Sequence, residues 1–145
     1  MASKHILIVE GRFYPSIADE MKAGAITALE AAGYSYEVID VPGALEIPAT
    51  IGFAANSKKF TGYIALGCVI RGETSHYHHV CHEAIHGLQK LALRERLAIG
   101  TGILTVEDQD QAHARGDQDK GNKGALAAAA CLRMIAIRSQ LLDPS

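Results

Sequence analysis

The chain has 145 residues, the size of one ordinary domain, and its 48% apolar and 21% charged residues are typical of a globular protein. Its formal net charge of −2 excludes the strongly basic surface that binds nucleic acid or anionic membranes. An anionic ligand therefore has to be bound by local groups.

The first part of the chain contains an apolar run followed by a helical pattern. Residues 5–10 are continuously apolar up to the final glutamate, which is typical of a strand covered on both faces. Pro15 opens a helix that ends near Gly33. Ser16 and Asp19 have the spacing of a capping box at the start of this helix.

The middle of the chain repeats this order. Residues 35–41 alternate between apolar and polar side chains, as in a strand, and a helix begins near Gly43 with Pro48 in its first turn. Residues 61–70 form a second apolar run that predicts a buried strand. After a polar turn, the spacing of apolar residues predicts a helix over 76–95.

A fourth strand over residues 97–106 precedes a short polar helix over 108–115 and an alanine-rich helix over 123–140. Serial strands and helices predict one α/β domain over residues 1–145, with helices on both faces of a parallel sheet. Such sheets bind ligands at the carboxyl ends of their strands, where the strand order reverses. We therefore look for functional residues in the turns that follow the strands.

Two further features bear on location. The longest apolar segment, residues 124–137, contains Arg133, and we expect no contact with a membrane. The three cysteines form no CxxC pair, and the first residues do not resemble a signal peptide. These features favour a cytoplasmic protein with reduced thiols.

Histidine is concentrated between residues 76 and 86. The segment 82–86 reads HEAIH, which matches the HExxH motif in which two histidines bind zinc and the glutamate acts as a base. No third histidine follows at the metzincin spacing, and His82 and His86 lie away from the apolar face of their helix. We expect this histidine face to be exposed or to meet another subunit. A zinc hydrolase that uses His82, Glu83 and His86 is a second candidate function.

The turn before the predicted helix at 76–95 is the stronger candidate site. Residues 72–75 offer backbone N–H groups at a helix N-terminus, which suits a phosphate or another anion. His76 stands in this turn and could move protons near neutral pH. Alternatively, Thr74 or Ser75 only caps the helix, and His76 is a solvated residue of its first turn.

Three further residues are weaker candidates, and for the first two a structural role is the alternative. Phe13 could stack on a planar ring or belong to the core. Glu46 could bind a polyol, or it is simply favoured by the dipole of its helix. Arg115 is suited to bidentate capture of phosphate. No P-loop or GxGxxG motif supports a nucleotide-binding fold.

Five segments in this order resemble the lumazine synthase family over nearly the whole chain. They are GRFYPS (11–16), VPGALEIP (41–48), ALGCVIRGETSHY (65–77), GILTVEDQDQAHAR (102–115) and KGNKG (120–124). The resemblance implies a flavodoxin-like three-layer sandwich with a four-stranded parallel sheet. It also implies a homopentamer, in some members an icosahedral shell, with active sites between neighbouring subunits.

The activity implied by the resemblance is that of a transferase of riboflavin biosynthesis. It condenses 5-amino-6-(D-ribitylamino)uracil with 3,4-dihydroxy-2-butanone 4-phosphate to 6,7-dimethyl-8-ribityllumazine, without a metal or an organic cofactor. The partners implied are these small molecules and other copies of the chain, not nucleic acid.

The resemblance also implies the roles of individual residues. His76 matches the catalytic proton-transfer histidine. The implied substrate-binding residues are Phe13, Ala44, Glu46, Val69, Ile70 and Lys123. The implied phosphate-binding residues are Gly72, Glu73, Thr74 and Arg115, the arginine being supplied by the adjacent subunit.

Three positions depart from the family pattern. Thr101 replaces a common phenylalanine, Asp119 a common lysine, and Leu126 an acidic residue that often supports the histidine. Because of Leu126, a non-catalytic relative that binds a flavin or lumazine is the third candidate function. The first strand begins near His5, and we expect an isolated pentamer instead of a shell.

Overall fold

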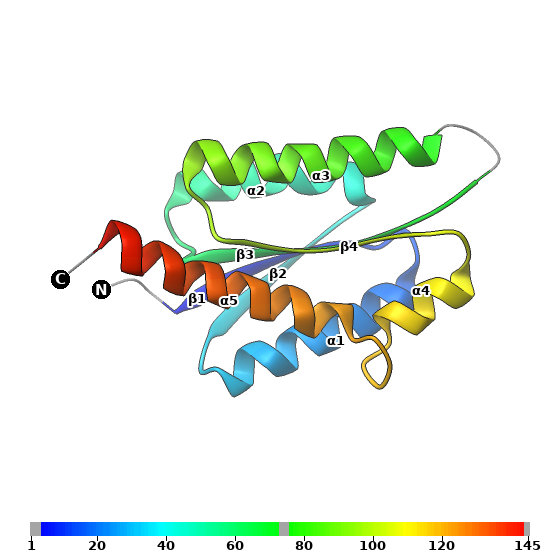
Figure 1. Cartoon of the computed structure of the whole chain (residues 1–145), viewed down its shortest axis with the longest axis horizontal. Helices are drawn as coiled ribbons and strands as arrows, with labels where there is room; N and C mark the ends of the chain where they lie inside the picture. Colours follow the sequence, from blue (N-terminus) through cyan, green and yellow to red (C-terminus); the bar gives the residue numbers. More distant parts are fainter. Residues whose placement is uncertain (1–3, 73–75, 144–145) are drawn as a thin grey trace.

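The computed structural model describes residues 4–72 and 76–143, and its centre is one parallel sheet with the strand order β2-β1-β3-β4 (Figure 1). The strands are β1 (His5–Gly11), β2 (Ser35–Val41), β3 (Gly62–Ile70) and β4 (Ile99–Val106). All four predicted strands are therefore confirmed, with bounds that differ by two residues or fewer. The parallel pairing confirms the predicted fold class.

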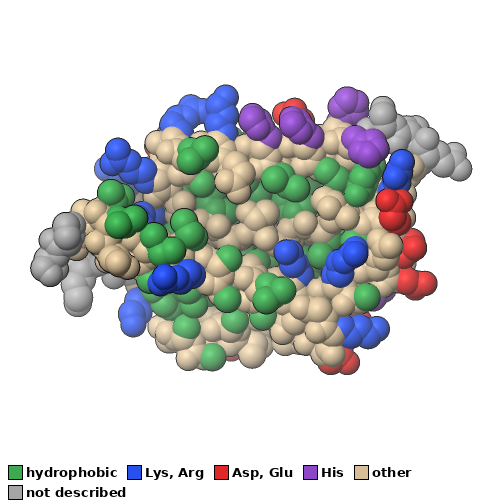
Figure 2. Space-filling model, viewed as in Figure 1, with side chains coloured by type: hydrophobic (Ala, Val, Ile, Leu, Met, Phe, Trp, Pro, Cys, Tyr) green, Lys and Arg blue, Asp and Glu red, His purple; other side chains and the backbone are tan. Residues whose placement is uncertain are grey.

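Helices cover both faces of the sheet, so that the molecule has three layers (Figure 1). The helices are α1 (Pro15–Ala31), the 3-10 helix η1 (Ala44–Glu46), α2 (Ile47–Ser57), α3 (His76–Glu95), α4 (Gln109–Gly116) and α5 (Lys123–Leu142). Helices α1, α4 and α5 pack together on one face, and α2 and α3 cover the other. Histidine side chains gather along the α3 edge of the molecule, as Figure 2 shows.

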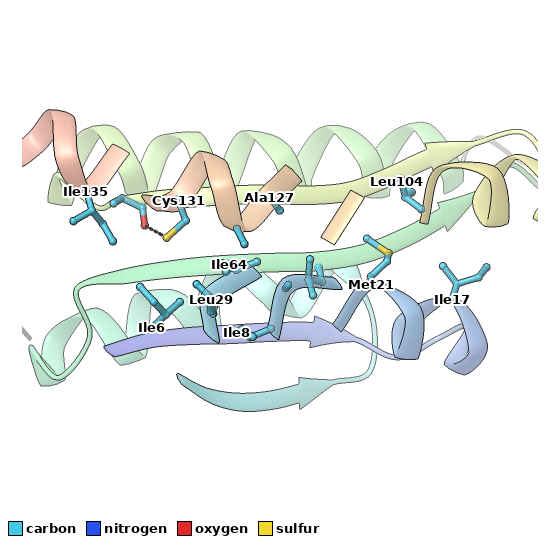
Figure 3. Close-up of a cluster of buried hydrophobic side chains, with 14 of the residues drawn as sticks. Ile6, Ile8, Ile17, Met21, Leu29, Ile64, Leu104, Ala127, Cys131 and Ile135 are labelled. Atoms are coloured by element: carbon cyan, nitrogen blue, oxygen red, sulfur yellow. Dashed lines mark hydrogen bonds between the residues drawn. The ribbon is translucent and has the colours of Figure 1, made fainter. Parts of the chain in front are cut away.

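The two faces of the central strands belong to two cores. Ile6 and Ile8 of β1 point toward α1 and α5, in the core drawn in Figure 3, whereas Leu7 and Val9 point toward α2 and α3. All four side chains are fully buried. Burying such a side chain stabilises the folded state by about 1.5–3 kcal/mol relative to leaving it in water. Burial on both faces of the strand explains why residues 6–9 are continuously apolar instead of alternating.

Two glycines allow α5 to approach the sheet and α1 closely. A Cβ on Gly100 would collide with the carbonyl oxygen of Ala127, and one on Gly124 with the carbonyl oxygen of Met21. By length and composition alone, α5 is long and apolar enough to cross a membrane, and its most apolar 18-residue segment is 22% buried in the fold. Arg138, near its end, donates hydrogen bonds to the carbonyl oxygens of Arg96 and Thr61, which ties α5 to the rest of the fold.

Helix α1 begins at Pro15 as predicted, but its capping differs from the sequence prediction. Tyr14 is the N-cap residue and makes no side-chain capping bond, so the capping box of Ser16 and Asp19 was wrong. Asp19 instead accepts a hydrogen bond of 2.7 Å from Arg12 Nη2. The predicted end of the helix is confirmed, because α1 stops at Ala31 and Gly33 has the left-handed φ of 80°.

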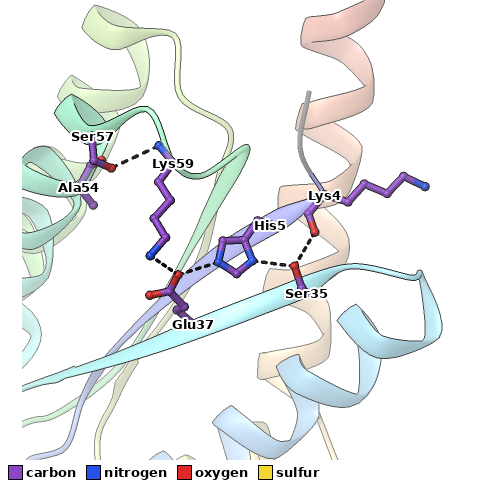
Figure 4. Close-up of polar contacts among 7 residues, drawn as sticks. All are labelled: Lys4, His5, Ser35, Glu37, Ala54, Ser57 and Lys59. Carbon is purple, nitrogen blue, oxygen red and sulfur yellow. Dashed lines mark hydrogen bonds and ion pairs between the residues drawn. The ribbon is translucent and has the colours of Figure 1, made fainter. Parts of the chain in front are cut away.

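A polar cluster closes the amino-terminal edge of the sheet (Figure 4). His5 Nε2 lies 2.7 Å and Lys59 Nζ 2.6 Å from the same Glu37 oxygen. His5 Nδ1 lies 2.6 Å from Ser35 Oγ. Hydrogen bonds from Lys59 and then His5 lower the pKa of Glu37. The cluster joins β1 and β2 to the loop before β3.

Candidate functional site

The carboxyl ends of three strands surround a cleft of about 400 Å³. It lies at the point where the strand order reverses, because the chain runs from β1 to β2 on one side and then crosses back over β1 to β3 on the other side. Its lining residues are Phe13, Tyr14, Pro42, Gly43, Ala44, Leu45, Glu46, Cys68, Val69, Ile70, Gly72, His76, Tyr77 and Val80. They come from the turns after β1 and β2, from the end of β3 and from the start of α3, at the strand ends where the site was expected.

The turn after β1 presents Phe13 to the cleft. Its ring is 72% exposed, so it belongs to the surface of the cleft and not to the core. It meets the ring of Tyr14 edge-on, with 5.0 Å between centroids. The preceding residue, Arg12, donates its backbone N–H to the carbonyl oxygen of Val41, and its side chain binds Glu10 and Asp19. The turn that carries Phe13 is thus fixed on both sides.

The turn after β2 brings Ala44 and Glu46 to the same cleft. Glu46 Oε1 accepts a hydrogen bond of 2.9 Å from the backbone N–H of Gly43, and the carboxylate remains exposed. One such bond uses only part of the accepting capacity of a carboxylate, which leaves room for hydroxyl donors. Gly11 is required here, because a Cβ on it would lie 2.9 Å from the carbonyl carbon of Gly43.

The end of β3 and the start of α3 form the third wall. Val69, Ile70 and Gly72 line the cleft together with His76 in the first turn of α3. The predicted phosphate-binding residues Glu73 and Thr74 lie outside the described residues. The N-terminus of α3 carries a positive partial charge that favours an anion next to His76.

Two predicted site residues are absent from the lining of this cleft. Arg115 lies near the end of α4, exposed, with its Nη1 3.4 Å from Gln111 Oε1. Lys123 is the first residue of α5 and is partly exposed. Their assigned contacts with substrate therefore stay predictions, which for Arg115 involve a second copy of the chain.

Seven lining residues of the cleft are not among the predicted site residues: Tyr14, Pro42, Gly43, Leu45, Cys68, Tyr77 and Val80. Tyr14 directly follows Phe13, and Tyr77 directly follows His76. Each tyrosine adds an aromatic ring to the lining. Cys68 lies two residues before Ile70, so the alternation of a strand could have found it. Burial raises the pKa of the Cys68 thiol to about 11, which keeps it protonated at neutral pH.

The HEAIH segment forms no closed metal centre in the described part of the chain. His82 and His86 are exposed on α3, with ring centroids 5.6 Å apart and ring planes 6° apart. Among the described residues, no three His, Cys, Asp or Glu side chains gather in a way that could hold a metal ion. A catalytic zinc site uses three protein ligands, so nothing in this geometry supports the zinc hydrolase.

The cleft combines aromatic and apolar surface with few polar groups, as is usual in small-molecule sites. Phe13 offers a face for a planar ring, and Glu46 accepts hydrogen bonds from hydroxyl groups. His76 can accept and return protons beside an anion at the helix end. This arrangement suits a ligand with a planar ring, a hydroxylated chain and a second, anionic reactant.

Comparison with known proteins gives a consistent result. The family model described as 6,7-dimethyl-8-ribityllumazine synthase matches residues 3–139. A protein of that name from Bartonella tribocorum is 53% identical over 140 residues, which are 96% of this chain and 93% of that protein. The protein so named from Sphingopyxis alaskensis is 51% identical over 136 residues, 94% of this chain and 96% of that protein. One from Rhizobium meliloti, 6,7-dimethyl-8-ribityllumazine synthase 1, is 50% identical over 142 residues, 94% of this chain and 93% of that protein.

Proposed function

The chain belongs to the 6,7-dimethyl-8-ribityllumazine synthase family, and we propose that the cleft between Phe13, Glu46 and His76 is its active site. The chain is an enzyme of riboflavin biosynthesis. It condenses 5-amino-6-(D-ribitylamino)uracil with 3,4-dihydroxy-2-butanone 4-phosphate, and it releases 6,7-dimethyl-8-ribityllumazine, inorganic phosphate and two molecules of water.

The observation that carries the assignment of the site is the meeting of these three residues, from three different strand ends, in one cleft. The pyrimidine ring stacks on Phe13, and the ribityl hydroxyls donate to Glu46. The backbone of Val69 and Ile70 contacts the edge of the ring. Ala44 lines the ribityl end of the cleft.

The reaction needs repeated proton transfer and a stabilised leaving group. The amine attacks the ketone and loses water to form an imine, phosphate is eliminated, and ring closure releases the second water. His76 relays protons between these steps, and the N-terminus of α3 with Gly72 binds the phosphate. Because both substrates are already reactive, much of the acceleration comes from holding them in the correct orientation.

We further propose that the protein is a cytoplasmic homopentamer whose active sites lie between neighbouring subunits. Large apolar side chains are exposed on the α2 and α3 layer, among them Phe53 at 77% and Leu93 at 81%. Such exposure is typical of a surface that another subunit covers. In this assembly Arg115 of a neighbour binds the phosphate and Lys123 contacts substrate.

A direct assay tests the activity: the two substrates are mixed with the protein and lumazine fluorescence is followed. We expect product formation that survives EDTA. Activity lost with EDTA would support a metal enzyme instead. Tight binding of a ribityl ligand without turnover would support a non-catalytic binding protein.

A complementation experiment tests the shared site. One chain carries Arg115→Ala and the other carries both Phe13→Ala and His76→Ala. After co-expression, some mixed sites contain an intact cleft from the first chain and Arg115 from the second, so activity rises above that of either variant alone. No gain in the mixed assembly would contradict a site completed by Arg115 of a neighbour. Native mass spectrometry of the wild type tests the pentamer against an icosahedral shell.

A further inference from the structure

Arg115, which the proposed active site takes from a neighbouring subunit, has no carboxylate partner in the described part of the chain. Arg12, by contrast, forms ion pairs with Glu10 and Asp19. The Nη1 of Arg115 instead donates a hydrogen bond of 3.4 Å to the amide oxygen of Gln111. The guanidinium is therefore held by a neutral acceptor, and its positive charge stays available to an anion.

The Gln111 side chain is itself fixed at the start of α4. Its amide oxygen accepts a hydrogen bond of 2.8 Å from the backbone N–H of Glu107. Its own backbone N–H donates, also at 2.8 Å, to Oδ1 of Asp108, the N-cap residue of the helix. Gln111 is half-buried, whereas Arg115, one turn further along the same face, is exposed. The amide oxygen is thus a fixed point to which a long, exposed side chain is tied.

We propose that Gln111 is a positioning residue that holds Arg115 ready for the phosphate group of the substrate in the neighbouring subunit. This inference rests on the proposed function, in which Arg115 completes that site. An exposed arginine loses rotamer freedom when it binds phosphate, and a tether lowers the entropic cost of binding. The guanidinium has several N–H donors, so one bond to Gln111 leaves the others for phosphate.

The neutrality of the acceptor distinguishes this role from that of a helix cap. A carboxylate at position 111 would also hold the guanidinium, but its charge would oppose the attraction between Arg115 and phosphate. An amide oxygen orients Arg115 without cancelling its charge. A helix cap alone is served equally well by glutamine and glutamate at this position.

Glu107 offers Gln111 a second route of action, through the cleft of its own subunit. The Glu107 carboxylate lies 3.3 Å from Nη1 of Arg71, the residue between Ile70 and Gly72 of the cleft. A variant of Gln111 could therefore disturb the cleft without any help from Arg115. The two routes differ in one respect, because only the first disappears when Arg115 is absent.

Steady-state kinetics of a double-mutant cycle, with the full-length assembled protein, test the proposal. Gln111→Met removes the acceptor and keeps an unbranched side chain of similar length. We expect it to raise the Michaelis constant for 3,4-dihydroxy-2-butanone 4-phosphate and the inhibition constant of inorganic phosphate by about 2- to 5-fold, the lower part of the range for a hydrogen bond. Arg115→Ala should raise both by about 10-fold or more, because it removes a charged donor. With Arg115→Ala present, Gln111→Met should have no further effect. The Michaelis constant for the pyrimidine substrate should stay unchanged in the Gln111→Met variant.

A charge variant separates positioning from helix capping. Gln111→Glu keeps the acceptor and the cap, so it should fold like the wild type. It should nevertheless raise the inhibition constant of inorganic phosphate, because the new carboxylate pairs with Arg115. Gln109→Glu adds the same charge at an exposed position of the same helix and is the matched control, which should leave this constant nearly unchanged. Normal inhibition by phosphate in Gln111→Glu would overturn the proposal in favour of a plain cap.

The cycle also distinguishes failure of this inference from failure of the shared site. If Arg115→Ala raises the two phosphate constants and Gln111→Met does not, the positioning role is overturned and the shared site stands. The same holds if Gln111→Met acts equally in both backgrounds. If Arg115→Ala leaves both constants unchanged, the shared site and the positioning role are both wrong. Circular dichroism and native mass spectrometry check that the variants fold and assemble.

Discussion

Arg12 Nη1 lies 2.8 Å from an oxygen of Glu10, a carboxylate that is almost fully buried at the end of β1. The same guanidinium binds Asp19 of α1, and Lys22 Nζ lies 3.4 Å from the other oxygen of Glu10. These contacts fix the turn on which Phe13 stands. A buried charge is thereby used to position an exposed aromatic ring.

Replacing Arg12 by alanine should destabilise the protein and disturb the cleft. Glu10 would keep only the longer contact with Lys22, and we expect the free energy of unfolding to fall by about 1–3 kcal/mol, less than for a fully buried pair. The Michaelis constant should also rise because Phe13 loses its support. Denaturant unfolding and steady-state kinetics measure both effects. Asp19→Asn, which changes only the exposed end of the network, is the control and should have a much smaller effect on stability.

The ring of Phe13 should matter for binding and not for stability. Because the ring is largely exposed, Phe13→Ala leaves the unfolding midpoint nearly unchanged. The loss of an aromatic contact costs about 0.5–1.5 kcal/mol, so the affinity for the pyrimidine substrate should fall by roughly 2- to 10-fold. Phe13→Tyr keeps the ring and should bind normally. Equal affinities of the alanine and tyrosine variants would contradict stacking on this residue.

The polar cluster at the opposite edge of the sheet predicts a dependence of stability on pH. The pKa of Glu37 is lowered in the folded protein, so its ionised form favours folding. This contribution is complete above the ordinary pKa of about 4.5 and is lost as the pH falls through the lowered pKa. Wild type should therefore be more stable than Glu37→Gln at neutral pH, and the difference should vanish in stronger acid. Glu30→Gln removes one exposed carboxylate from α1 and controls for net charge. A difference that stays constant with pH would exclude this role of Glu37.

Much of the fold could be predicted because its strands are short apolar runs between longer helical patterns. Residues 6–9 are apolar at every position because alternate side chains enter two different cores. The start of α1 at Pro15 was predicted correctly, but its capping box was mispredicted, because Asp19 binds Arg12 and that contact across the turn leaves no local pattern. Phe13 and His76 were found as residues after strand ends. Cys68 was missed because a thiol inside an apolar run resembles any other core residue.

The partly buried thiol of Cys68 in the cleft should resist alkylation. Burial raises the pKa of Cys68 to about 11, and the thiolate is the reactive form. At pH 7.5, native protein should therefore react with iodoacetamide at Cys68 far more slowly than protein unfolded in urea. Peptide mapping after a timed reaction measures this site separately from Cys81 and Cys131. Rapid labelling of Cys68 in the native protein would show that desolvation does not raise its pKa.

His76→Ala should slow lumazine formation without abolishing it. A general acid–base residue contributes about 10²–10⁴ to a rate, and the lower end applies here because water can replace the imidazole in an open cleft with two reactive substrates. Orientation by Phe13, Glu46 and the N-terminus of α3 remains intact and retains part of the acceleration. We therefore expect the turnover number to fall by about 100-fold while the Michaelis constants change little.

The neighbouring surface histidine provides the control for this experiment. His79→Ala removes an exposed imidazole from the same helix, outside the cleft, and should leave turnover unchanged. Binding of substrate by the His76→Ala variant is measured separately by calorimetry. Complete loss of turnover with normal binding would mean that His76 does more than relay protons, because orientation alone would then give no measurable catalysis.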